Sequence, residues 1–213
     1  MSDVAPQDKV VRDDEPDEII DFRRLRVGSV GKGSSGYSGM VALIATEASL
    51  FGYLLFSYYY MAFQLGPEWV IELPGFKLSG PNTAILIASS GAVWFAERAA
   101  KRGQRMRVLA GLGSAILLGL IFIGIQWKEW ADKSFTPATD SYGSIFFVTT
   151  GFHMAHVVIG VLVLAALFLW TAMGLFSSER HAPIGIGALY WHFVDVVWLG
   201  VFFTFYITPR LGI

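Results

Sequence analysis

One stretch decides how this chain folds: Tyr190-Trp191-His192-Phe193-Val194-Asp195-Val196-Val197-Trp198. It lies inside an apolar segment, Pro183 to Ile207, that is long enough to cross the hydrocarbon core of a bilayer as one helix. His192 and Asp195 are the strongly polar side chains of this segment, and their i, i+3 spacing places them on one helical face. An aspartate at the centre of a bilayer costs roughly 2.5 to 3.5 kcal/mol. This face should therefore contact protein rather than lipid.

A second apolar segment, Tyr142 to Thr171, offers a matching polar face. It contains two histidines at the same i, i+3 spacing, in Thr150-Gly151-Phe152-His153-Met154-Ala155-His156. Because a buried carboxylate needs a hydrogen-bonding partner, we expect one of these histidines to satisfy Asp195.

The composition places most of the chain in a bilayer. Hydrophobic residues make up 54% of the sequence and charged residues only 15%, which is typical of a membrane protein that crosses the bilayer several times. The absence of cysteine excludes disulfides, thiolate metal sites, iron–sulfur clusters and a covalently attached c-type haem. The net charge of −1 and the lack of a basic stripe exclude nucleic acid as a partner.

The chain divides into a polar tail and a membrane domain. Residues 1–36 lack apolar periodicity and end in a glycine and serine run, which is typical of a mobile tail. Glycines 31, 33 and 36 match a dinucleotide-binding pattern, but no strand precedes them, so we assign them no nucleotide. Residues 37–213 should form an all-α bundle of five membrane helices, at about Gly39–Phe63, Pro81–Ala100, Met106–Gln126, Tyr142–Thr171 and Pro183–Ile207.

The basic residues predict the orientation of the bundle. They concentrate in the tail and in the connection around Lys101 and Arg102, and are scarce in the connections on the opposite side. The positive-inside rule then places the amino terminus in the cytoplasm and, after five crossings, the carboxyl terminus outside.

Glu47 in the first segment adds a carboxyl group at a similar depth. A rise of 1.5 Å per residue from the segment ends places Glu47, His153, His156, His192 and Asp195 in the middle half of the membrane. These five groups could form one buried network.

Two further carboxylates lie at segment ends. Glu97 should pair with Arg98 or Arg102 at the cytoplasmic edge. Glu129, at the outer end of the third segment, should lie near enough to solvent to need no special partner. Neither position indicates a function.

Three interpretations of the central polar group remain open. Three imidazoles and one or two carboxylates could bind zinc or non-haem iron, although a full histidine-box set is absent. Intramembrane charge could instead mark the pathway of an autonomous transporter, although no internal repeat or pair of broken helices is present. The third interpretation is a structural hydrogen-bonded network that fixes helix packing, and the residues favour it modestly.

The two polar motifs, in this order, resemble subunit III of the haem–copper respiratory oxidases. The resemblance covers residues 37 to about 209, and further motifs that fit it are Thr46-Glu47-Ala48-Ser49-Leu50-Phe51, Ala96-Glu97-Arg98 and Gln126-Trp127-Lys128-Glu129-Trp130. It implies a non-catalytic subunit of a proton-pumping terminal oxidase that reduces oxygen to water in a bacterial plasma membrane. The electron donor, cytochrome c or a quinol, belongs to other chains.

The resemblance also implies partners and site residues. The expected partners are subunit I by direct packing, subunit II, small subunits and phospholipid, with haem and copper held by the partner subunits and no metal in this chain. Glu47 matches a family glutamate linked to proton uptake, and the matching polar residues of the helix core are His153, His156, His192 and Asp195. Longer family members have seven helices around a lipid-filled cleft, whereas this chain begins where their third helix would. The other wall of that cleft must come from another subunit or be absent.

Overall fold

The computed structural model describes residues 35–70, 72, 75–178 and 180–211, and every regular element in these ranges is a helix. The predicted tail lies outside the described residues except for Ser35 and Gly36, which begin the first helix. The long helices are α1 (Ser35–Leu65), α2 (Phe76–Lys101), α3 (Arg105–Ala131), α4 (Ser141–Ala172) and α5 (Ala182–Phe202). The all-α prediction is therefore confirmed for the described residues.

Four of these helices are long and apolar enough to cross a membrane: α1, α3, α4, and α5 with its continuation to Leu211. The prediction of five spans goes further than this, because α2 matches the others in length but is less apolar. The polar side chains that lower its hydropathy are buried inside the protein, at Ser79, Asn82, Thr83 and Ser89.

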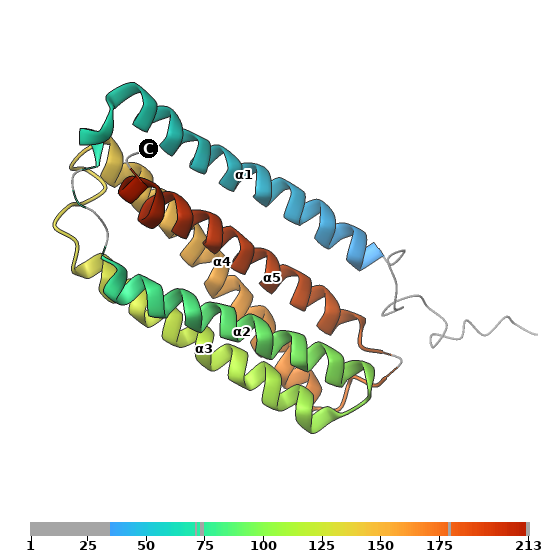
Figure 1. The fold of residues 1–213 in the computed structure, drawn as a ribbon. Helices are drawn as coiled ribbons and strands as arrows, with labels where there is room; N and C mark the ends of the chain where they lie inside the picture. The colour runs from blue at the N-terminus through green and yellow to red at the C-terminus, as the bar shows by residue number, and fades with distance from the viewer. Residues whose placement is uncertain (1–34, 71, 73–74, 179, 212–213) are drawn as a thin grey trace, which may run out of the picture.

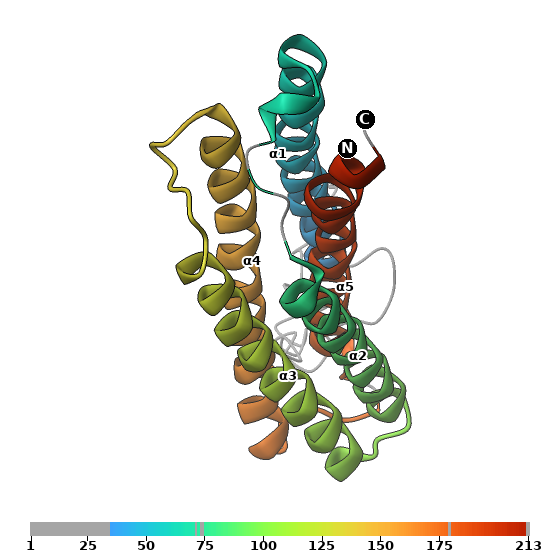
Figure 2. The ribbon, with the colours of Figure 1, turned by 60° about the vertical axis from the view of Figure 1, so that its left-hand side comes forward.

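Helices α2 to α5 form a ring of four neighbours, and α1 lies outside it. Helix α2 packs on α3, α3 on α4, α4 on α5 and α5 on α2, while α1 lies along α4 and α5 (Figures 1 and 2). The described surface of α1 is mostly exposed, and the helix buries only Phe51 and Tyr58. The core of the protein is therefore the interior of the α2–α5 group.

Two glycines make room for the largest side chain in that interior. The Trp191 indole is fully buried, and a Cβ atom at Gly160 of α4 would lie 2.8 Å from its ring. A Cβ atom at Gly119 of α3 would lie 3.0 Å from the same ring. Close approach through small residues is the ordinary means of helix packing in membranes, and here it forms a slot for one tryptophan.

The helix boundaries agree with the sequence to within a few residues, with two informative exceptions. Helix α2 begins at Phe76 rather than at Pro81, so Pro81 lies inside the helix, where it lacks the N–H group for one helical hydrogen bond. Helix α3 continues past Gln126 to Ala131. Beyond Phe202 the last helix continues as a π-helical turn, Phe203–Ile207, and then as a 3-10 turn, Thr208–Leu211.

Candidate functional site

Glu47 of α1 and His156 of α4 form an ion pair or hydrogen bond across the two helices. The Glu47 Oε2 atom lies 3.0 Å from His156 Nε2. His156 Nδ1 lies 2.7 Å from the Phe152 carbonyl oxygen, and because a carbonyl can only accept, Nδ1 carries a hydrogen. The contact with Glu47 therefore holds one proton, either on a neutral carboxyl group or on an imidazolium. In both arrangements the pair has no net charge, which suits an apolar environment.

Other side chains cover the His156 side of this pair, whereas the Glu47 side is partly exposed. The Phe51 ring lies edge-on to the His156 imidazole at 5.1 Å, and the Tyr190 hydroxyl donates to the His156 carbonyl at 3.4 Å. The Glu47 side chain keeps 26% of its surface exposed, against 11% for His156. The Glu47 side of the pair is therefore the more exposed one.

The other two membrane histidines make separate contacts. His192 of α5 lies with Nδ1 2.6 Å from the Ser90 hydroxyl of α2. His153 of α4 donates from Nε2 to the Val194 carbonyl of α5 at 3.3 Å, and its ring lies 4.8 Å from that of Trp198. His153 is buried, and its Nδ1 has no hydrogen-bond partner in the described part of the chain.

The expectation that a histidine satisfies Asp195 is wrong. Asp195 is 7% exposed, and neither carboxyl oxygen has a hydrogen-bond partner among the described residues. The reason is that His192 turns to Ser90 and His153 turns to a backbone carbonyl. The five central groups therefore do not form one network. Glu47 contacts His156 between α1 and α4, His192 contacts α2, His153 contacts α5, and Asp195 has no hydrogen-bond partner among the described residues.

The prediction that Glu97 pairs with Arg98 or Arg102 is also wrong. Glu97 pairs with Lys101 at 2.6 Å, one helical turn away on the same face. Arg98 instead places its guanidinium 3.6 Å above the Trp94 ring. Consecutive residues on a helix face different directions, so Arg98 cannot share the face of Glu97.

Glu129 is buried, contrary to the expectation that it lies near solvent. It is 4% exposed and accepts a hydrogen bond from the Tyr206 hydroxyl at 2.7 Å. Lys133 lies 3.7 Å from the same carboxyl oxygen, and both side chains are 5% exposed. The physical reason is the extra length of α3, which carries Glu129 inward against the π-helical turn of α5.

The hydroxyl groups of α2 that accept hydrogen bonds from tryptophans of α5 were not predicted from the sequence. The Trp191 indole donates to the Ser89 hydroxyl and the Trp198 indole donates to the Thr83 hydroxyl, both at 3.0 Å. A signal was available in the sequence, since Asn82 and Ser89, and likewise Thr83 and Ser90, lie seven residues apart, which is about two helical turns and places each pair on one side of the helix.

A metal interpretation receives no support from the described residues. In ranges 35–70, 72, 75–178 and 180–211, no three side chains of the His, Cys, Asp and Glu types lie close enough together to hold one ion.

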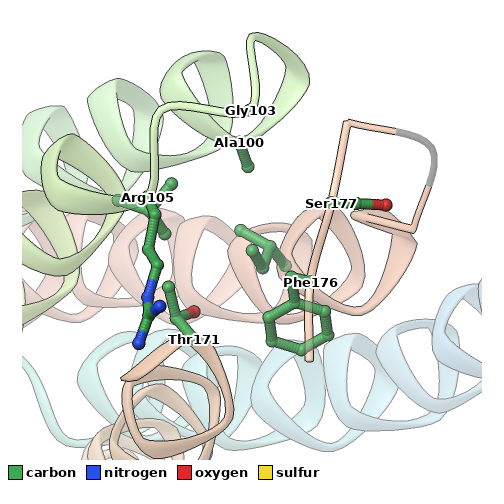
Figure 3. Close-up of a pocket in the computed structure, with 8 residues that line it drawn as sticks. Ala100, Gly103, Arg105, Thr171, Phe176 and Ser177 are labelled. Atoms are coloured by element: carbon green, nitrogen blue, oxygen red, sulfur yellow. The ribbon is translucent and has the colours of Figure 1, made fainter. Parts of the chain in front are cut away.

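Two hollows lie at the helix boundaries. A groove of about 420 Å³ runs between α1 and α4 and is lined by Tyr53, Phe56, Ser57, Tyr60, Met61 and Ile145. A recess of about 20 Å³ lies at the opposite end of the bundle, beside Gly103 and Phe176 (Figure 3). There the Arg105 guanidinium donates to the Ala172 carbonyl at the end of α4, where a positive charge is favourable.

Known proteins share this sequence pattern. The family described as cytochrome c oxidase subunit III matches residues 28–209, a range that holds all five long helices. Cytochrome c oxidase subunit 3 of Cyprinus carpio is 38% identical over 176 residues, which cover 79% of this chain and 67% of the carp protein. The proteins of that name from Danio rerio and Salmo salar are 37% and 38% identical with the same coverage. This chain therefore belongs to the cytochrome c oxidase subunit III family, and it is a membrane subunit of a terminal oxidase complex.

Proposed function

We propose that this chain is the non-catalytic subunit of a proton-pumping oxidase and that its Glu47–His156 pair supports proton uptake by the complex. The contact between Glu47 Oε2 and His156 Nε2 carries the proposal, because it binds one proton at the partly exposed edge of the bundle. A group that moves a proton must lie within hydrogen-bond reach of the atom that holds it, and this pair meets that condition. Haem and copper belong to the partner subunits.

Stabilisation of the catalytic subunit is the second part of the proposal. Large apolar side chains stay exposed on every long helix, among them Phe63, Trp94, Leu117, Leu162 and Val196. In the membrane such side chains can contact either lipid or another subunit. We propose that part of this surface packs on subunit I, with subunit II and small subunits completing the complex.

Phospholipid binding fits the groove between α1 and α4. Its lining combines the rings of Tyr53, Phe56 and Tyr60 with the flexible Met61 side chain, and its volume of about 420 Å³ can hold part of an acyl chain. Helix α1 buries only Phe51 and Tyr58 among its described residues, so the rest of its apolar surface can form a wall for lipid.

The proposed membrane topology has five crossings with the amino terminus in the cytoplasm of a bacterial plasma membrane. Helix α2 can cross because its polar side chains at Ser79, Asn82 and Ser89 are buried against other helices instead of facing lipid. The electron donor of the complex is proposed to be cytochrome c, which is the donor in the relatives' name, and a quinol is the alternative.

The test replaces Glu47 with Gln in the whole oxidase. Gln keeps the size of the side chain and can still hydrogen-bond to His156, so the complex should assemble with its haems at wild-type yield. Proton uptake should become slower, or inactivation during turnover faster. Glu68→Gln is the matched control, since Glu68 lies exposed in the connection between α1 and α2. Wild-type proton uptake and wild-type lifetime in Glu47→Gln would remove the proton role.

A further inference from the structure

The Asp195 carboxyl is a buried group that the proposed function leaves unused. Both of its oxygens are enclosed by protein, and no described group lies in hydrogen-bonding position to either one. An ionised carboxylate in such a place is costly, because its desolvation is not offset by a partner. The neutral, protonated form avoids that cost, so this position favours a carboxyl group that holds a proton.

Ser90 connects this carboxyl to a histidine. Its hydroxyl lies 2.6 Å from His192 Nδ1 and beside the Asp195 carboxyl, although it does not meet the geometry of a hydrogen bond to Asp195. When His192 Nδ1 carries a hydrogen, Nδ1 donates to the Ser90 oxygen. The Ser90 hydroxyl hydrogen is then not used by His192, and a rotation of the Asp195 side chain is needed to bring a carboxyl oxygen into hydrogen-bonding position with it.

The His192 side chain is directed towards the end of the bundle at which α2 ends and α5 begins. The pairs Ser89 with Trp191 and Thr83 with Trp198 show that α2 and α5 run antiparallel. Helical side chains lean towards the amino terminus of their own helix, so Glu97 leans into the bundle while His192 leans out towards it. Glu97 lies seven residues after Ser90 on α2, two helical turns towards that end, and its side chain is 24% exposed.

We propose that Asp195, Ser90 and His192 form a proton-binding site between α2 and α5, loaded from the Glu97 end of the bundle. A proton enters at His192 Nε2, and the Nδ1 hydrogen passes to the Ser90 oxygen. The original Ser90 hydroxyl hydrogen then passes to an Asp195 carboxylate oxygen. The site gains one proton, His192 is left neutral with its hydrogen on Nε2, and a change of tautomer restores the starting state.

The site is separate from the Glu47–His156 pair and does not depend on it. The other titratable groups around it are Glu97 with Lys101 on α2, and His153 on α4. Lys101 pairs with Glu97, and His153 is bound to the Val194 carbonyl. Neither group occupies the Asp195 oxygens.

Infrared spectroscopy on the purified oxidase tests this proposal. Asp195→Asn should remove one carboxylic acid C=O band from the wild-type spectrum, which assigns that band to protonated Asp195. On transfer to D₂O the band should shift quickly in the wild type. Ser90→Ala and His192→Gln should slow the shift by at least about tenfold, because each interrupts one proton-transfer step. Gln at position 192 can still hydrogen-bond to Ser90, so helix packing there is kept.

Ser89→Ala and Ser90→Thr are the controls. Ser89 is the neighbour of Ser90 but serves the Trp191 indole, so its removal should leave the exchange rate at Asp195 unchanged. Ser90→Thr keeps the hydroxyl and should exchange as the wild type does. The proposal is overturned if Asp195→Asn removes no carboxylic acid band, or if the band exchanges at the wild-type rate in either Ser90→Ala or His192→Gln.

Discussion

Glu47 of α1 lies 3.0 Å from His156 of α4, and this contact joins the outermost helix to the four-helix group. Helix α1 is also held by the Tyr59 hydroxyl, which lies 3.3 Å from the Thr204 and Thr208 hydroxyls beyond α5, and by the buried rings of Phe51 and Tyr58. The pair thus combines a titratable site with a structural connection. Its two functions can be separated by measuring stability and proton uptake on the same variants.

A double-mutant cycle should show that the two residues are coupled. Glu47→Gln and His156→Gln each keep a hydrogen-bonding group but remove the charge-assisted part of the contact, so either should destabilise the purified chain by up to about 1 kcal/mol. The double variant should lose less than the sum, with an interaction energy of at least about 0.5 kcal/mol. Thermal unfolding in detergent, followed by tryptophan fluorescence, measures all four proteins.

Glu47→Gln with Ser90→Ala provides the matched additive cycle. Ser90 contacts His192 between α2 and α5 and shares no contact with Glu47. The effects of this second pair should add within about 0.5 kcal/mol. If the free energies of unfolding are additive in both cycles, the Glu47–His156 contact contributes nothing to stability.

The slot around Trp191 should resist even one added methyl group. Gly160→Ala places a Cβ atom 2.8 Å from the Trp191 ring, and the buried indole has no free space into which to move. Overpacking of this kind costs about 1–3 kcal/mol, which a thermal unfolding midpoint will show. Gly151→Ala on the same helix is the control, because a Cβ atom there meets nothing within 4 Å. That variant should be neutral or stabilised, since alanine favours helix, and equal midpoints for the two variants would contradict the slot.

Replacing a small residue in the lining of the lipid groove with a large one should fill the groove. Ser57→Trp adds an indole to the lining between α1 and α4 and should reduce the phospholipid that co-purifies with the oxidase. Mass spectrometry of extracted lipid, relative to haem content, measures the loss. Ala45→Trp is the control on an exposed part of α1 outside the groove lining. Wild-type lipid content in Ser57→Trp would show that the groove is not a lipid site.

The sequence predicted the helices well because segment length and hydropathy directly reflect the thickness of the bilayer. It also placed His192 and Asp195 on one buried face, which follows from helical spacing alone. It could not predict their partners. Ser90 and Asp195 are both suitable partners for His192, and the choice depends on how α2 and α5 are rotated against each other. The five-crossing topology and the orientation of the termini stay predictions.

Glu129 shows the same limit at a helix end. Its neighbours in the sequence, Lys128 and Trp130, are typical of a membrane surface, and nothing in that pattern indicates burial. Burial follows from two features that pattern does not encode: α3 continues to Ala131, and the π-helical turn of α5 turns Tyr206 towards the carboxyl group.

Tyr206→Phe should therefore be one of the more destabilising single substitutions in this chain. It removes the donor to Glu129 Oε1 and leaves a carboxyl group that is 4% exposed with Lys133 at 3.7 Å as its remaining partner. Loss of a hydrogen bond to a charged group costs about 1.5–3 kcal/mol, and the cost is higher when the remaining group stays buried. Tyr60→Phe is the control, since Tyr60 is 52% exposed on α1 and should shift the thermal midpoint by much less. The double variant Tyr206→Phe with Glu129→Leu should recover part of the loss, because it removes the unpaired carboxyl group as well. A Tyr206→Phe protein as stable as the Tyr60→Phe protein would show that the buried Glu129–Tyr206 contact does not hold α3 to the end of α5.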